Sequence, residues 1–188
     1  MRYLLILLIS FLFSTTVSGQ YSSRVNAFMQ TGYSLPMPRD AHMDNYYTGG
    51  YNMELHIVSS FSKRSSDARL SLLINSGLNW FGGKTWWGYD SQGYFTEYRS
   101  QSIFVVPVHA GLRLDFGNTR SYGSGLYVSQ DFGLTYIDGP TGGSRYGHTF
   151  NIGSILNRFD VGFGFNTWKG STGNKFHFIA FRMGYMIF

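Results

Sequence analysis

Residues 50–62 read GYNMELHIVSSFS, and apolar and polar side chains alternate along almost the whole stretch. The side chains of one parity are mostly apolar and those of the other are polar: Tyr51, Met53, Leu55, Ile57 and Phe61 alternate with Asn52, Glu54, His56, Ser60 and Ser62. Successive side chains of a β-strand point to opposite faces, so a period of two is typical of a strand with one apolar and one polar face. The stretch is therefore predicted to be a β-strand.

The same period recurs through the rest of the chain. Together with the first stretch it predicts strands at about 24–34, 50–62, 68–80, 99–116, 122–136, 146–156, 158–168 and 175–188. After residue 20, no continuous apolar run approaches the roughly 20 residues that a membrane-spanning helix needs. The expected fold class is all-β, with eight antiparallel strands in up-and-down order.

Two classes of connection join the predicted strands. Short polar connections are expected at 63–67 and 117–121 and at a turn around Asn157, and longer loops at 35–49, 81–98, 138–145 and 169–174. The classes alternate, and the first and last connections are long, so both chain ends are predicted on the side of the short turns. An even number of strands with short turns at one end and longer loops at the other is typical of a transmembrane outer-membrane β-barrel.

Aromatic residues are expected at two levels of such a barrel. If the first strand runs toward the long loops, one level holds Tyr33, Tyr51, Trp80, Tyr98, Tyr136, Tyr146, Trp168 and Phe176, and the other holds Phe61, Phe116, Tyr122, Phe159 and Phe188. Aromatic belts at both ends of an apolar band are typical of proteins in a bilayer. The alternative is that some of these rings reflect only the preference of aromatic residues for strands.

The composition is unusual for a soluble domain. Aromatic residues make up 19% of the chain and charged residues 13%, against an average of about 25% charged in soluble proteins. The formal net charge of +5 comes from scattered basic residues, without a basic stripe, so nucleic-acid binding is not expected. Anionic outer-membrane lipid and lipopolysaccharide are the expected partners of such a surface.

The first 19 residues predict a secretory signal peptide. Arg2 supplies the positive charge, residues 3–13 are apolar, and Val17-Ser18-Gly19 resembles a cleavage site. The alternative is an uncleaved anchor, but the apolar core is shorter than a spanning helix requires. The expected domains are thus a signal peptide at 1–19 and one barrel domain at 20–188.

The polar faces of the predicted strands carry ionisable side chains. In a closed barrel these faces point inward, where charges must pair. The candidates for ion pairs in the lumen are Glu54, His56, Arg69, His109, Arg113, Asp131 and Arg182, with Asp115 and Asp160 on the same faces. Such a network either packs the lumen as a polar core or gates a narrow water path.

The chain resembles the small eight-stranded outer-membrane barrels of the OmpA/OmpX-like class, and more narrowly the outer-membrane β-barrel domain of Bacteroidota. The features that carry the resemblance are the eight-strand pattern, the segment FDVGFGFN at 159–166 and the terminal run HFIAFRMGYMIF at 177–188. It implies the outer membrane of a Gram-negative bacterium, with both termini in the periplasm. It also implies that Tyr185 and Phe188 close the barrel and signal to the barrel-assembly machinery. Phe188 shares its parity with Arg182, which leaves the facing of this last ring open.

Enzymatic activity is not expected from the sequence. Outer-membrane lipid A deacylases place a Ser two residues from a His on one strand, and none of the histidines at 56, 109, 148 and 177 has a Ser two residues on. For the palmitoyltransferase type, only His42 with Asp40 and Asp44 is suggestive. No catalytic residue, metal site or cofactor is therefore predicted.

The second long loop, FGGKTWWGYDSQGYFTEYR at 81–99, is rich in aromatic residues. Trp86, Trp87, Tyr89 and Tyr94 are candidates for stacking on a glycan or docking on a protein ligand. The alternative is that the tryptophans only contact the lipopolysaccharide interface. The expected function is a structural or surface-interaction role. The two alternatives are a narrow pore or gated channel with an ion-paired lumen and a lipid A-modifying enzyme.

Overall fold

The computed structural model describes residues 25–37, 46–61, 68–117, 125–138, 142–169 and 175–187. The predicted signal peptide, the residues around His42, and Tyr122 and Phe188 lie outside these ranges. Within them, no helix is long and apolar enough to cross a membrane.

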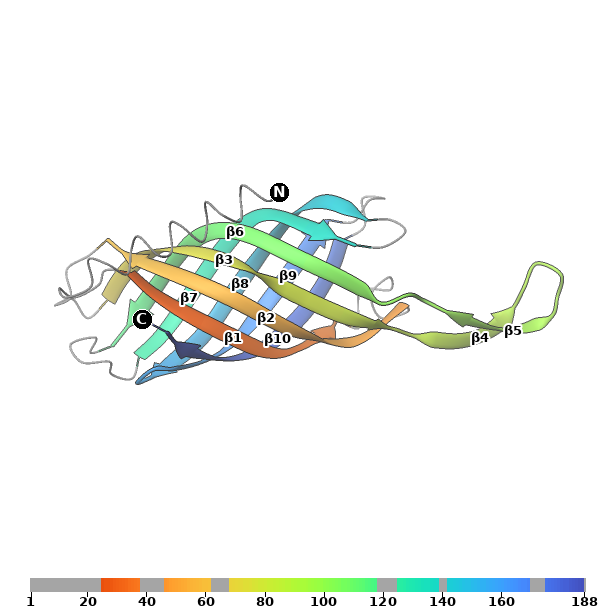
Figure 1. Ribbon diagram of the computed structural model, residues 1–188, viewed down its shortest axis with the longest axis horizontal. Helices are drawn as coiled ribbons and strands as arrows, with labels where there is room; N and C mark the ends of the chain where they lie inside the picture. Colours follow the sequence, from red (N-terminus) through yellow and green to blue (C-terminus); the bar gives the residue numbers. More distant parts are fainter. Residues whose placement is uncertain are drawn as a thin grey trace.

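The architecture is a closed barrel of eight antiparallel strands (Figure 1). The strands are β1 (Val25–Pro36), β2 (Tyr47–Ser60), β3 (Ala68–Gly83), β6 (Ile103–Phe116), β7 (Gly125–Ile137), β8 (Gly143–Leu156), β9 (Phe159–Lys169) and β10 (Lys175–Met186). Each strand pairs with the next one in this order, and β10 pairs with β1. The predicted fold class is confirmed.

The barrel closes where the last strand meets the first. β1 and β10 are antiparallel over nine residue pairs, from Phe28 opposite Met186 to Pro36 opposite Phe178. Tyr185 lies within this seam, opposite Met29. A signalling role of Tyr185 in assembly stays a prediction.

The two ends of the barrel differ in their connections. One end, called here the long-loop end, holds the C-termini of β1, β3, β7 and β9 and the N-termini of β2, β6, β8 and β10. At the opposite, short-turn end, β8 and β9 are joined by Asn157 and Arg158 alone. Asn157 has a φ of 59°, and Asn tolerates this left-handed conformation better than most residues do.

The second long loop is a β-hairpin, which the sequence analysis did not predict. β4 (Thr85–Tyr89) pairs with β5 (Phe95–Arg99), and the hairpin extends far from the long-loop end of the barrel (Figure 1). The predicted strand at 99–116 therefore begins only at Ile103. The hairpin turn is held by Asp90, whose Oδ1 accepts hydrogen bonds from the backbone N–H groups of Gln92 and Tyr94 at 2.9 Å.

The faces of the barrel strands follow the predicted alternation, with apolar side chains outside and polar side chains inside. Outward Met53, Val108 and Leu134 are 50%, 56% and 63% exposed. Inward residues are buried, among them Asn52, Glu54, Asn75, His109, Ser129, Asp131, Asn151 and Asp160. This arrangement is the reverse of that in a water-soluble protein.

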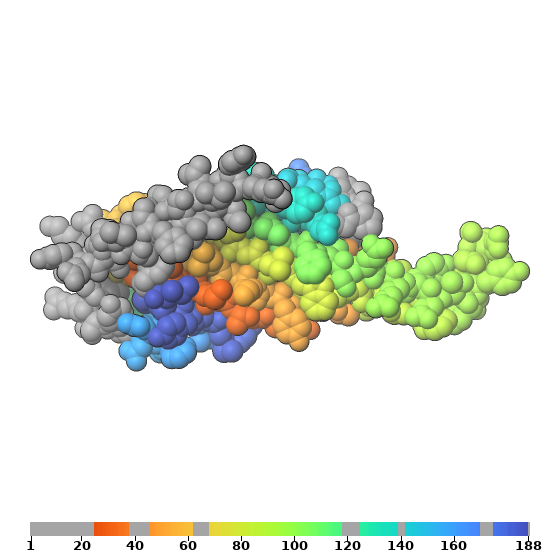
Figure 2. Space-filling model, viewed as in Figure 1, coloured from red at the N-terminus to blue at the C-terminus, as the bar shows by residue number. Residues whose placement is uncertain are grey.

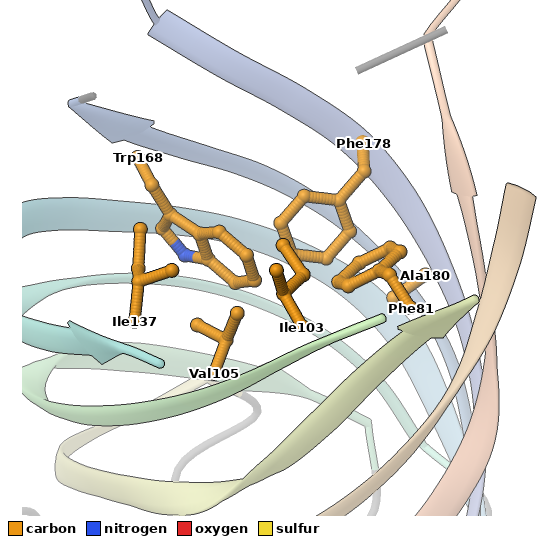
Figure 3. Packing of buried hydrophobic residues seen from close by; sticks show 7 residues of the cluster. All are labelled: Phe81, Ile103, Val105, Ile137, Trp168, Phe178 and Ala180. Atoms are coloured by element: carbon orange, nitrogen blue, oxygen red, sulfur yellow. The ribbon is translucent and has the colours of Figure 1, made fainter. Parts of the chain in front are cut away.

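Two apolar clusters also lie inside the barrel. The upper cluster, at the long-loop end, consists of Phe81, Ile103, Val105, Ile137, Trp168, Phe178 and Ala180 (Figure 3). The lower cluster, toward the short-turn end, consists of Phe28, Val58, Leu73 and Met186. The lumen thus combines these two apolar clusters with buried ionisable side chains, which lie both at its centre and toward the short-turn end.

Three of the aromatic residues predicted for the outer belt at the long loops lie elsewhere. Trp168 is buried and Phe176 packs against the upper cluster, because both share the parity of inward-facing residues on their strands. Tyr98 belongs to the projecting hairpin. The other exposed belt residues follow the prediction: Tyr33, Tyr51, Trp80, Tyr136 and Tyr146 at one level, and Phe61, Phe116 and Phe159 at the other.

The closure seam generates a test of the fold. A Cβ at Gly32 would overlap the backbone carbonyl of Phe181 on β10. We expect Gly32→Ala to lower the free energy of unfolding by about 1–3 kcal/mol, because the backbone at the seam must move. Urea unfolding of the refolded barrel in detergent measures the change.

Gly88→Ala is the matched control. A Cβ there would lie 3.5 Å from the Tyr98 ring, which is an ordinary contact, and we expect a change within about 0.5 kcal/mol. Equal stabilities of the two variants would contradict the described seam.

Candidate functional site

The centre of the lumen holds a carboxylate between two basic side chains. Glu54 and His56 point inward from β2, and Arg182 points inward from β10. Arg182 Nη2 lies 3.0 Å from Glu54 Oε1, and His56 Nε2 lies 3.0 Å from Glu54 Oε2. The structure therefore brings three of the predicted lumen residues together across β1.

Arg182 also donates to amides on β9, the strand beside it, and on β8, the strand after that. Its Nη1 donates to Asn151 Oδ1, and its Nη2 lies 3.3 Å from Asn166 Oδ1. A Cβ at Gly164 would overlap the guanidinium, so the glycine leaves the space that this side chain fills. The arginine thus links β2 and β10 to β8 and β9.

A second polar group ties β6 to β7. His109 Nδ1 lies 2.8 Å from Asp131 Oδ1, and His109 Nε2 lies 2.9 Å from Thr135 Oγ1. The order of carboxylate, imidazole and hydroxyl resembles that of a catalytic triad. All three side chains are buried inside the barrel, at 2% exposure or less. Their described contacts fit a structural role.

A third group lies toward the short-turn end. Arg113 Nε donates to Asp115 Oδ1 at 2.8 Å, and Arg113 Nη1 lies 3.6 Å from Asp160 Oδ2. Tyr127 donates its hydroxyl to Asp160 Oδ1 at 2.8 Å, and its ring centroid lies 3.6 Å from Arg113 Cζ. Sequence reasoning did not select Tyr127 for this cluster, although its parity on β7 is that of Ser129 and Asp131.

Arg69 is the predicted lumen residue that stays apart from these groups. It lies on β3 opposite Asp115 in register, yet it forms no ion pair with any of the described residues. Asp115 instead pairs with Arg113. The described ionic contacts of the lumen thus involve the other six candidates, with Asp115, Asp160 and Tyr127.

The lumen is filled with side chains. In the upper cluster the ring centroids of Trp168 and Phe178 lie 4.3 Å apart, and those of Phe81 and Phe178 lie 5.2 Å apart (Figure 3). The side chains of Glu54, Asp131 and Arg182 are exposed by 3% or less. Side chains that line a water-filled channel would be in contact with water, so the described lumen is a packed core.

The hairpin places the predicted loop residues on two faces. Trp86 stacks on Tyr98, with ring centroids 5.8 Å apart, and the rings of Trp86 and Tyr46 pack in a T-shaped arrangement. On the other face Trp87 stacks on Phe95 at 5.6 Å, and Tyr89 packs against the same ring at 5.3 Å. Sequence reasoning missed Phe95, which the hairpin register places opposite Tyr89.

The second face is open to solvent. Trp87, Tyr89 and Phe95 are 60%, 74% and 62% exposed, and the hairpin stands clear of the barrel in Figure 2. Tyr94, at the turn, is also exposed. These rings form an aromatic surface, called here the hairpin face, that is available to a ligand.

Comparison with known proteins supports the fold. No protein-family model matches the chain, and no curated protein matches it in sequence. Among solved structures, the outer-membrane enzyme PagL is similar with a TM-score of 0.55 and 10% identity, over 85% of this chain and 98% of that one. Neisserial surface protein A, NspA, is similar with a TM-score of 0.50 and 13% identity, over 87% of this chain and 96% of that one. Both are small proteins of the same barrel fold.

The central ion pair can be tested by removing one partner. Arg182→Met leaves Glu54 buried without its cationic partner, and we expect a loss of about 3–5 kcal/mol in the free energy of unfolding. The double variant Glu54→Gln/Arg182→Met removes both charges and is expected to recover most of this loss. Urea unfolding in detergent measures all the variants. A double variant no more stable than Arg182→Met would show that the two side chains do not act as a pair.

Proposed function

We propose that this chain is an integral β-barrel of the outer membrane of a Gram-negative bacterium, with both termini in the periplasm. Its role is structural or surface-interacting and non-enzymatic. The observation that carries the proposal is the apolar outer face of a barrel whose interior is polar. The outer-membrane enzyme PagL and the surface protein NspA share the fold.

The outer face favours lipid over water. Each of the eight strands exposes Leu, Ile, Phe or Met side chains, which are roughly half exposed, and covering the remaining surface with lipid would stabilise each by about 1 kcal/mol. The barrel strands contain 11 to 16 residues, so each reaches the roughly 9–11 residues that a tilted strand needs to cross a bilayer. A closed ladder also leaves no strand edge unpaired in hydrocarbon.

The hairpin face supports a surface-interaction role. Trp87, Tyr89 and Phe95 lie beyond the barrel on a two-stranded extension. Flat aromatic surfaces of this kind stack on sugar rings and dock on proteins. We infer that this face binds a glycan or protein ligand outside the cell.

The packed lumen does not favour the alternative function, a narrow pore or gated channel. A conducting path would need the upper cluster and the Glu54–Arg182 pair to move aside, at the cost of a buried ion pair. Similarity to PagL at 10% identity concerns the fold. Among the described residues, no arrangement singles out the lipid A-modifying alternative, and His42 with Asp40 and Asp44 lies outside them.

Excision of the hairpin tests the proposed role. Lys84 and Ser100 are joined by a backbone hydrogen bond of 3.0 Å, so Thr85–Arg99 can be replaced by Gly-Gly without spreading the barrel strands. We expect the shortened protein to reach the outer membrane and to keep its change in SDS mobility on boiling, because the barrel is intact. Cells displaying it are expected to lose binding to a glycan array or to host-protein arrays at least tenfold.

A double variant and a single-residue control refine this test. Trp87→Ala/Tyr89→Ala removes rings from the hairpin face and is expected to reproduce the loss, whereas Ser91→Ala at the hairpin turn is expected to bind as the unaltered chain does. Equal binding by cells with and without the hairpin would refute a role in surface interaction. Recovery of the unaltered chain in the soluble fraction would refute the membrane assignment.

A further inference from the structure

Polar side chains interrupt the apolar outer face near the long-loop end. His148 on β8 is opposite Thr167 on β9, and Thr167 is opposite His177 on β10. Thr167 Oγ1 lies 2.9 Å from His177 Nδ1. All three share the outward parity of their strands and are half-buried. Sequence reasoning did not find this row, because its three residues belong to three strands and become neighbours only in the observed strand register.

Two lysines lie beside this row, toward the long-loop end. Lys169 ends β9, Lys175 begins β10, and the two are directly opposite each other. Strand alternation places both lysines on the outer face. Lys169 is two residues from Thr167 and Lys175 is two residues from His177, a separation of about 6.6 Å along each strand. Like charges directly opposite each other are destabilising, so this arrangement needs a reason.

The surroundings offer the lysines no described anionic partner. Neither is ion-paired with any carboxylate in the described parts of the chain. Residues 170–174, which join the two strands, read GSTGN and carry no acidic side chain. An anion bound between the two ammonium groups would relieve their repulsion.

The position of the cluster identifies the kind of anion. Tyr146, two residues from His148 and on the same face, is exposed in the aromatic level at the long loops. In a membrane barrel this level lies among the lipid headgroups. On the side toward the barrel middle, Phe150 is opposite Phe165, and Phe165 is opposite Ile179. Apolar side chains thus lie where the acyl chain of a lipid would run.

We propose that Lys169, Lys175, Thr167, His177 and His148 form a binding site for the phosphate group of an anionic lipid in the outer leaflet. The lysines supply charge, and the Thr167 hydroxyl or a histidine N–H supplies a hydrogen-bond donor. The row Phe150, Phe165 and Ile179 accommodates an acyl chain and favours a lipid over free phosphate. The assignment of the outer leaflet rests on the proposed function, which places the long-loop end outside the cell.

The test compares lipids with the full chain refolded in an uncharged detergent. Native mass spectrometry and thermal unfolding are measured with bisphosphorylated lipid A, with dephosphorylated lipid A and with inorganic phosphate. We expect only the phosphorylated lipid to remain bound and to raise the unfolding temperature. Equal binding of dephosphorylated lipid A, or equal stabilisation by inorganic phosphate at the same concentration, would overturn the lipid-phosphate assignment.

Lys169→Gln/Lys175→Gln is expected to weaken binding of phosphorylated lipid A at least tenfold. Arg99→Gln/Arg158→Gln removes the same charge from the hairpin and the short-turn end, and its affinity is expected to stay within twofold of the unaltered chain. Equal affinities of the two double variants would overturn the site. SDS mobility before and after boiling reports barrel folding separately. Failure of the unaltered chain to reach the outer membrane would instead overturn the proposed function.

Discussion

The pairing of β1 with β10 is the interaction on which the rest of the structure depends. An unpaired backbone N–H or C=O group in hydrocarbon costs several kcal/mol, so a sheet can cross a membrane only if it has no edge. Closure of the eight strands meets this requirement for the whole described barrel. It also separates the side chains into an outer and an inner set, because neighbouring residues of a strand point to opposite faces.

The inner set explains the chemistry of the lumen. An eight-stranded barrel has an interior just wide enough for side chains to fill. Buried charges in so small a space must be paired, and here Glu54 is bonded by Arg182 and His56 while Arg113 lies between two aspartates. The upper cluster packs at the long-loop end of the lumen, and Phe28 of the lower cluster lies against Arg113. The lumen therefore acts as a core, and the surfaces proposed to carry function are the hairpin face and the outer wall.

Strand alternation made the fold, the faces and the inward ionisable residues predictable from sequence. Register was not predictable, because it depends on how far each strand is shifted along its neighbour; the contacts Glu54–Arg182 and Thr167–His177 follow from it. The aromatic character of Trp168 and its position near a strand end predict the outer belt. The parity of Trp168 with Asn166 indicates the lumen, and the structure follows the parity. The hairpin at 85–99 was missed because its strands contain only five residues each.

Site-specific labelling of intact cells tests the central claim, that this barrel spans the outer membrane with its hairpin outside. The chain contains no cysteine, so Tyr94→Cys in the hairpin and Arg158→Cys in the β8–β9 turn each introduce one reactive thiol. A maleimide too large to cross the outer membrane is expected to label Tyr94→Cys on intact cells, and to label Arg158→Cys only after the membrane is permeabilised. Equal labelling of both positions on intact cells, or labelling of Arg158→Cys alone, would contradict the account.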